Sequence, residues 1–298
     1  MSQDWQRQPE RSNPLMLRLL LWIARALGRR VARGLLVPIV GYFLLTGGAA
    51  RQASRNYLRR ILGREPGWRD IARHFHAFAS VSLDRFFLLA GDTRDFDIRI
   101  DRPQTVYDLS QSRRGCLLLL AHLGSFEVFR VHGIDDRGLP LRILMDTAHN
   151  RMFMSVLRRL NPRLMEAVID AGQGGPTLVL ALKQALDEGS MIGMMSDRHR
   201  GGERVVEVDF LGARARLPAS PWILAGTLGV PVILAFGLYR GGNRYDVHFE
   251  LVPGPLALPR ANREQALREH AQRYADRMQH HLRGAPYNWF NFYDYWQT

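Results

Sequence analysis

Five short apolar runs without polar alternation constrain the fold of this chain more than any other feature. Stretches in which apolar residues recur at helical spacing separate them. A strand that lacks alternation is buried on both faces, as in a parallel sheet covered by helices on each side. The sequence therefore predicts an α/β fold, a largely parallel mixed sheet flanked by helices. The runs are residues 116–121, 141–145, 167–169, 191–195 and 231–238.

Two further segments, 205–210 and 244–251, alternate apolar with polar residues, which predicts antiparallel strands or hairpins there. A helix is expected at 125–132 and a final one at 263–283. An aromatic tail, 287–296, follows that last helix. Its rings are expected to serve either as anchors at a membrane interface or as a cap on the core.

The composition limits the kinds of site that the chain can hold. Of the 298 residues, 46% are hydrophobic, enough for a sizeable core, and Cys116 is the only cysteine. A single cysteine excludes an intrachain disulfide and any multi-cysteine metal site. The His74–His76 and His280–His281 pairs lack a carboxylate or cysteine at ligand spacing. We expect no metal site.

Positive charge is concentrated near the N-terminus. The chain has 41 Lys and Arg against 28 Asp and Glu, and its first 70 residues hold 13 arginines against four acidic residues. Such a bias favours an anionic partner: a membrane surface, a nucleic acid or an acidic substrate. No DNA- or RNA-binding motif accompanies the charge, so we expect no nucleic-acid partner.

Residues 1–50 are predicted to be a membrane-associating segment, and residues 51–298 the main domain. On a helix over 14–33, four arginines form one stripe beside leucines and Trp22, as on a helix at a bilayer interface. Residues 34–50 carry no charge but contain Pro38 and four glycines, so the segment is either interfacial or single-pass. Basic flanks would keep the following domain on the cytoplasmic side. The alternative is an amphipathic helix that caps the core. The stripe consists of Arg18, Arg25, Arg29 and Arg33.

The turn after the first apolar strand carries a histidine and a carboxylate. In residues 121–127 (AHLGSFE), His122 precedes the expected helix and Glu127 lies in its first turn. From the loop the imidazole can fold back toward Glu127, which would fix its tautomer and stabilise the imidazolium. The amides of Gly124 and Ser125 are expected to bind a developing oxyanion. Ser125 lacks the second glycine of a nucleophile elbow, so His122 is expected to act on a substrate hydroxyl or amine. A purely structural histidine is the alternative.

Polar residues also follow two of the other apolar runs. Asp197 and Arg198 come after residues 191–195, where an arginine fork can hold a phosphate or carboxylate, and a surface ion pair is the alternative. Asp146 and Asn150 follow 141–145 and are expected either to line the same cleft or only to make the loop polar. We predict substrate binding by Gly124, Ser125, Asp146, Asn150, Asp197 and Arg198.

Four segments in a fixed order resemble the lysophospholipid (glycerolipid) acyltransferase superfamily. They are AHLGSFEVFR, MIGMMSDR, VDFLG and ILAGTLGVPVILAF. The likeness is closest to the branch of LpxL-like late acyltransferases of bacterial lipid A assembly, in which an N-terminal membrane segment precedes the domain. Three features differ from that branch: Asp197-Arg198 replaces a usual Asp-Gln, residues 145–150 (MDTAHN) replace a usual Asp-Asn segment, and the C-terminal tail is aromatic rather than basic.

The resemblance implies a membrane-associated acyltransferase. In such an enzyme an acyl chain passes from a thioester on acyl carrier protein or coenzyme A to a hydroxyl or amine of a lipid or glycolipid. His122 and Glu127 match the catalytic pair of the family, and no cofactor is implied. The expected location is the bacterial inner membrane, with the catalytic domain on the cytoplasmic side. A thioesterase and a non-catalytic membrane scaffold are the alternative functions.

Overall fold

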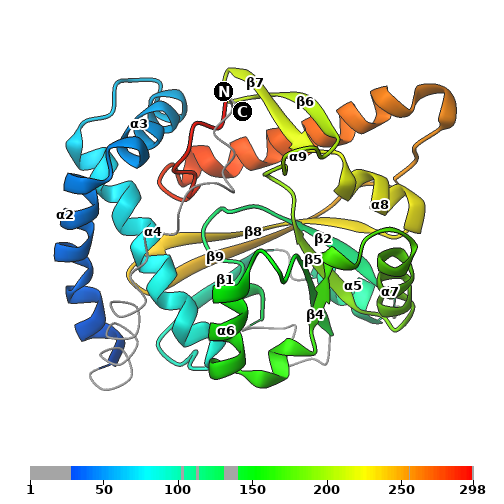
Figure 1. Cartoon of the computed structure of the whole chain (residues 1–298), viewed down its shortest axis with the longest axis horizontal. Coiled ribbons are helices and arrows are strands. Elements are labelled where there is room, and N and C mark those ends of the chain that lie inside the picture. Colours follow the sequence, from blue (N-terminus) through cyan, green and yellow to red (C-terminus); the bar gives the residue numbers. More distant parts are fainter. Residues whose placement is uncertain (1–27, 102–103, 112–113, 131–139, 255, 297–298) are drawn as a thin grey trace.

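The fold is built around a seven-stranded sheet (Figure 1). The structure is a computed structural model that describes residues 28–101, 104–111, 114–130, 140–254 and 256–296. The strand order is β1-β9-β8-β2-β5-β3-β4, and every neighbouring pair is parallel except β8 with β9. The predicted α/β fold with a largely parallel mixed sheet is confirmed. The strands are β1 Asp97–Asp101, β2 Cys116–Leu120, β3 Leu141–Met145, β4 Val168–Asp170, β5 Met191–Met195, β8 Val232–Gly241 and β9 Arg244–Leu251.

The two alternating segments form antiparallel pairs, as predicted. β6 (Val205–Phe210) and β7 (Ala213–Pro218) make a separate two-stranded sheet, and β9 runs antiparallel to β8. β2 is buried at every position, which agrees with its lack of polar alternation.

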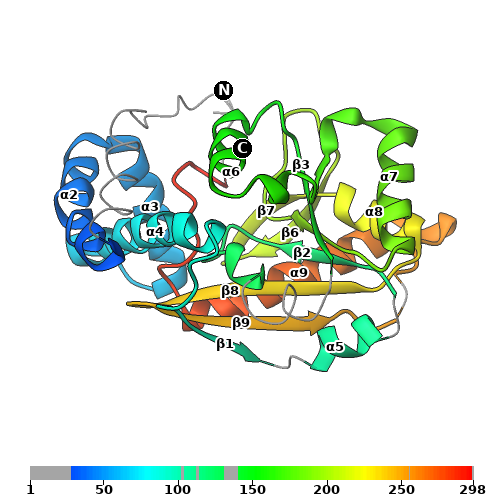
Figure 2. The same cartoon turned by 90° about the horizontal axis from the view of Figure 1, so that it is seen from below.

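Helices cover the central sheet and extend beyond one end of it. α9 packs on β6 and β8, whereas α2, α3 and α4 gather beside the end of the β8–β9 hairpin, as Figures 1 and 2 show. The helices are α2 Leu36–Thr46, α3 Gly48–Leu62, α4 Trp68–Leu89, α5 Gln104–Gln111, α6 Arg151–Leu160, α7 Gly175–Asp187, α8 Ser220–Leu228 and α9 Arg263–Gly284.

Two arginines of the predicted interfacial stripe point into the protein instead. Arg29 is 8% exposed, and its Nε and Nη2 atoms donate to the two oxygens of Asp84 at 2.8 Å. Arg33 donates from Nη2 to the Tyr239 hydroxyl at 2.8 Å. A buried carboxylate on α4, Asp84, attracts both side chains, so they do not form an outward-facing stripe. Arg18 and Arg25 lie outside the described residues.

The uncharged segment, residues 34–50, bends sharply between α2 and α3. In the described part of the chain, no single helix combines the length and the apolar character needed to cross a bilayer. The helical stretches Gly28–Thr46 and Gly48–Leu62 meet that requirement only as a pair, and they are bent by 96°. Membrane association and the domain division at residue 50 therefore stay predictions.

The aromatic tail caps the core. Trp289 is fully buried and Tyr295 is 4% exposed, and both belong to the main apolar cluster beneath α9. Trp289 also bridges Leu123, directly after His122. Between the two interpretations of the tail, the structure favours the core cap.

The turn after β2 is held between the tail and β8. Gly124 N–H donates to Asn288 O, and Ser125 N–H donates to Gly237 O, each at 2.8 Å. A Cβ atom at Gly237 would lie 2.1 Å from the carbonyl oxygen of Ser125. Only glycine at this position of β8 lets the turn approach so closely.

Gly237→Ala should therefore lower the free energy of unfolding by about 2–3 kcal/mol, the range of a strongly overpacked site. Gly284→Ala is the matched control, because no atom lies within 4 Å of its Cβ position. Chemical unfolding of the two variants and the parent protein measures the effect. Equal stability of Gly237→Ala and the parent would show that the close approach does not constrain the turn.

Candidate active site

His122 and Asp197 lie side by side at the carboxyl edge of the sheet. β2 and β5 are parallel neighbours in which Leu120 pairs with Met195, so each residue follows its strand by two positions. The His122 Nδ1 atom lies 2.8 Å from Oδ1 of Asp197, and the His122 amide lies 3.2 Å from Oδ2. The parallel register thus brings together two groups that are 75 residues apart in sequence.

Asp197 is completely buried and is stabilised as a carboxylate. Trp289 Nε1 donates to Oδ2 at 2.9 Å, and Arg198 Nε lies 4.0 Å from the same oxygen. Burial by itself would raise the pKa of Asp197, but contact with His122, the Arg198 charge and the Trp289 hydrogen bond hold this pKa well below its usual range. Asp197 is therefore ionised at neutral pH.

His122 is held in the neutral form with Nε2 available as a base. Burial and the positive charge of Arg198 lower the pKa of His122 below its ordinary 6.5, against the opposing effect of Asp197. Because a carboxylate only accepts hydrogen bonds, Nδ1 carries the ring proton and donates a hydrogen bond to Asp197. The His122 side chain is 36% exposed, so it can reach a substrate.

Glu127 makes different contacts from those predicted. It begins a 3₁₀ turn, Glu127–Arg130, within the helix expected at 125–132, of which residues 131 and 132 lie outside the described residues. Its buried carboxylate accepts a hydrogen bond of 2.7 Å from Ser125 Oγ and is ion-paired with Arg85 of α4. The Nδ1 atom of His122 faces Asp197, so Asp197 holds the position that the sequence assigned to Glu127. A catalytic role for Glu127 stays a prediction.

Arg85 is a site residue that the sequence analysis did not identify. Its guanidinium lies 5.1 Å from the centroid of the Phe126 ring and 5.9 Å from that of Phe153, and its side chain is 35% exposed. The Arg85 charge contributes to lowering the pKa of His122. The only signal in the sequence was an arginine within an apolar helical stretch.

The amides expected to bind an oxyanion are engaged elsewhere. The N–H groups of Gly124 and Ser125 donate to the carbonyls of Asn288 and Gly237, and the Ser125 side chain is buried against Glu127. These amides hold the turn in place, and the structure therefore does not support the predicted oxyanion contact. Arg198 donates to Phe290 O at 2.6 Å and lies over the Tyr293 ring at 5.5 Å, so it fastens the C-terminal tail to the site.

Asp146 and Asn150 belong to a loop at the same sheet edge, after β3. Asp146 Oδ2 accepts from His149 Nδ1 at 2.8 Å and from Arg200 Nη1 at 2.7 Å. Asn150 Nδ2 donates to Asp146 O at 2.8 Å. Burial by itself would raise the pKa of Asp146, but contact with His149 and Arg200 lowers this pKa below its usual value. The cluster shapes this loop, and substrate binding by its residues stays a prediction.

Cys116 lies in β2, the strand that leads to the site. Burial raises the pKa of the Cys116 thiol to about 12, so it is not a nucleophile at neutral pH. Among the described residues, no group of three or more His, Cys, Asp or Glu side chains is placed to hold a metal ion.

Comparison with known families gives one match, which covers nearly the whole chain. A family model described as bacterial lipid A biosynthesis acyltransferase matches residues 9–298. No curated protein matches the chain. The matched range includes β2, β5 and the turn that carries His122.

A double-mutant cycle can measure how much the Arg85–Glu127 ion pair contributes to the free energy of unfolding. Arg85→Met leaves the buried Glu127 carboxylate without its cation, so we expect the free energy of unfolding to fall by about 2–3 kcal/mol, less than for a fully buried pair. Arg85→Met combined with Glu127→Gln should recover most of that loss. Chemical unfolding of the four proteins measures the coupling, with Arg159→Met, an exposed arginine on α6, as the neutral control. Strictly additive effects would show that the two side chains do not stabilise each other.

Proposed function

The chain belongs to the bacterial lipid A biosynthesis acyltransferase family, and we propose that His122 is the general base of its acyl transfer. The observation that carries the proposal is the hydrogen bond from His122 Nδ1 to the buried Asp197 carboxylate. This bond fixes the tautomer that leaves Nε2 unprotonated, on an imidazole whose pKa is already lowered.

In the proposed reaction, Nε2 removes the proton from a hydroxyl or amine of the acceptor. The acceptor oxygen or nitrogen attacks the thioester carbonyl carbon, and the tetrahedral intermediate collapses as the carbon–sulfur bond breaks. The imidazolium then returns the proton to the departing thiolate. Asp197 stabilises that imidazolium, as a buried acid does for the histidine of a catalytic triad. A positioned base of this kind contributes about 10²–10⁴ in rate.

Arg85 supplies positive charge for the oxyanion of the tetrahedral intermediate in this mechanism. Its charge helps to lower the pKa of His122 and its side chain is partly exposed, whereas the amides of Gly124 and Ser125 are already hydrogen-bonded. Glu127 then acts as a positioning residue, because its ion pair fixes the Arg85 side chain. Preorganised charge of this kind is worth about 10²–10³ in rate.

The proposed donor is a thioester of acyl carrier protein or coenzyme A, and the proposed acceptor is a membrane lipid or glycolipid. The family supports a lipid acceptor, and the net charge of +13 suits both an acidic carrier and an anionic membrane surface. Large apolar side chains are exposed on the N-terminal helical part, which suits contact with a bilayer. They are Val31, Val37, Tyr42, Leu45 and Trp68. We place the enzyme at the bacterial inner membrane, with its domain on the cytoplasmic side.

His122→Ala should reduce kcat by at least about 10²-fold, and Asp197→Asn should also reduce it because the tautomer is no longer fixed. His280→Ala is the matched control, since His280 is exposed on α9 and belongs to neither the catalytic pair nor the predicted substrate-binding residues. Thiol release from an acyl thioester measures the rate in the presence and absence of a lipid acceptor. Release only with the acceptor supports transfer, and release without it indicates a thioesterase. Unchanged turnover in His122→Ala would contradict the proposal.

The pH profile offers a separate prediction. Because burial and Arg198 lower the pKa of His122, the imidazole remains neutral from pH 7 downward until the pH passes below 6.5. With a hydroxyl acceptor, kcat/KM should therefore fall on the acid side with a midpoint below 6.5. Arg198→Gln should move that midpoint upward, and the exposed Arg159→Gln should leave it in place. A midpoint above 6.5 in the parent enzyme would contradict the assignment.

A further inference from the structure

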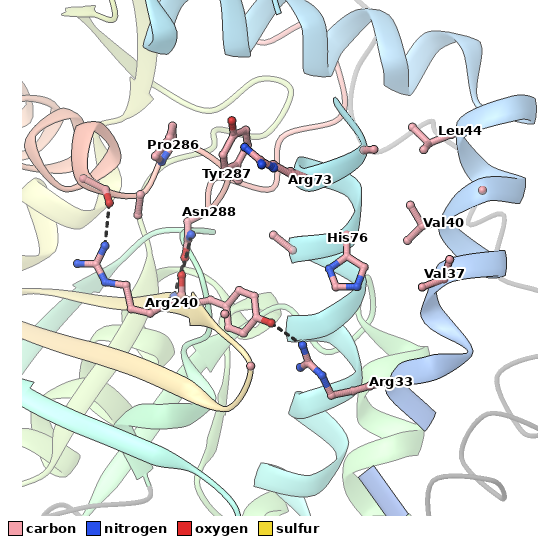
Figure 3. A pocket seen from close by; sticks show the side chains of 18 residues that line it. Arg33, Val37, Val40, Leu44, Arg73, His76, Arg240, Pro286, Tyr287 and Asn288 are labelled. Carbon is pink, nitrogen blue, oxygen red and sulfur yellow. Dashed lines mark hydrogen bonds between the residues drawn. The ribbon is translucent and has the colours of Figure 1, made fainter. Parts of the chain in front are cut away.

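A groove separate from the catalytic turn lies between α2, α4 and the end of the β8–β9 hairpin (Figure 3). Its volume is about 840 Å³, within the range of pockets that hold ligands. α2 contributes an apolar wall of Val37, Val40 and Leu44. Neither His122 nor Asp197 lines the groove.

Three arginines from different elements also line the groove, and Arg73 and Arg240 lie across it from the α2 wall (Figure 3). Arg73 is exposed on α4. Arg33 donates to the Tyr239 hydroxyl, and its buried Nη1 atom has no hydrogen-bond partner among the described residues, although it lies 3.8 Å from Oδ2 of Asp84. Arg240 is ion-paired with Asp246 and donates from Nη1 to Gly284 O at 2.8 Å. Positive charge therefore exceeds negative charge at the rim, and an arginine side chain holds a phosphate through charge-assisted hydrogen bonds.

α2, which forms the apolar wall of the groove, also has apolar side chains exposed to solvent. Tyr42 is 57% exposed, and Leu45 is 77% exposed. Val37, which lines the groove, is itself 67% exposed. Where this apolar surface of α2 contacts a bilayer, a lipid molecule could enter the groove directly from the membrane.

We propose that this groove binds an anionic phospholipid of the bilayer, with an acyl chain on the α2 wall and the phosphate among Arg33, Arg73 and Arg240. The inference rests on the membrane contact proposed above. Asn288 is the structural link to the active site, because it lines the groove and its carbonyl accepts the Gly124 N–H. Bound lipid would brace α2 against the segment that holds the catalytic turn.

Native mass spectrometry tests the proposal on the full chain in non-ionic detergent, with equal amounts of dioleoyl-phosphatidylglycerol and dioleoyl-phosphatidylcholine. We expect preferential retention of phosphatidylglycerol. Arg73→Glu should reduce that retention by about tenfold or more, because a charge-assisted contact becomes repulsive. Gly41→Trp should also reduce it, since Gly41 lines the groove and no atom lies within 4 Å of its Cβ position.

Two matched controls keep charge and size effects separate. Arg268→Glu reverses an exposed charge on α9, and Gly34→Trp adds the same bulk outside the groove, where no atom lies within 4 Å of the Cβ position. Both should retain phosphatidylglycerol as the parent does. Equal retention of the two lipids, or equal losses in test and control variants, would overturn the proposal.

Acyl transfer is measured in parallel in detergent free of phospholipid. Intact transfer in Arg73→Glu and Gly41→Trp is expected, because neither residue belongs to the catalytic site. Loss of transfer in both would assign the groove to the substrates of the reaction and overturn a separate lipid site. The binding result does not depend on vesicle attachment or on His122, so failure of this proposal and failure of the proposed function can be distinguished.

Discussion

The hydrogen bond between His122 Nδ1 and Asp197 is the interaction on which the rest of the site depends. A fully buried carboxylate is costly unless it is paired and hydrogen-bonded. Trp289 and Arg198 satisfy that requirement together with the imidazole, and Tyr295 donates to the Asp197 carbonyl at 2.9 Å. The aromatic tail thus completes the environment of Asp197, and it forms one structural unit with the turn that carries His122.

A second buried carboxylate ties the N-terminal helices to the sheet. Asp84 of α4 accepts both hydrogen bonds from Arg29 and a third, at 2.7 Å, from the Tyr245 hydroxyl of β9. Arg29 also donates to Gly242 O in the β8–β9 turn at 2.7 Å. The start of the described chain is thereby fixed against the hairpin. α2 can then present one side to the groove and another outward, which is the arrangement that the lipid-site proposal requires.

The sequence was sufficient to predict the sheet and to select His122 as a candidate, but it did not reveal the contact between His122 and Asp197. Apolar runs such as 116–121 show burial on both faces, which determines the fold class. Strand order and register, which bring Asp197 beside His122, depend on contacts between distant segments that no local pattern records. Glu127 was close in sequence, yet a 3₁₀ turn and Arg85 direct its carboxylate elsewhere. The Arg29 contact was missed for a related reason, since helical spacing shows which residues share a face but not what that face meets.

The most direct test of the account is the tautomer of His122 at pH 7, observed by nitrogen-15 NMR on protein labelled at histidine. The resonances are assigned with His122→Gln. We predict a neutral imidazole protonated at Nδ1, with the Nε2 atom unprotonated, and loss of this single tautomer in Asp197→Asn. An imidazolium at pH 7, or a neutral ring protonated at Nε2, would contradict the assignment of His122 as a base oriented by Asp197.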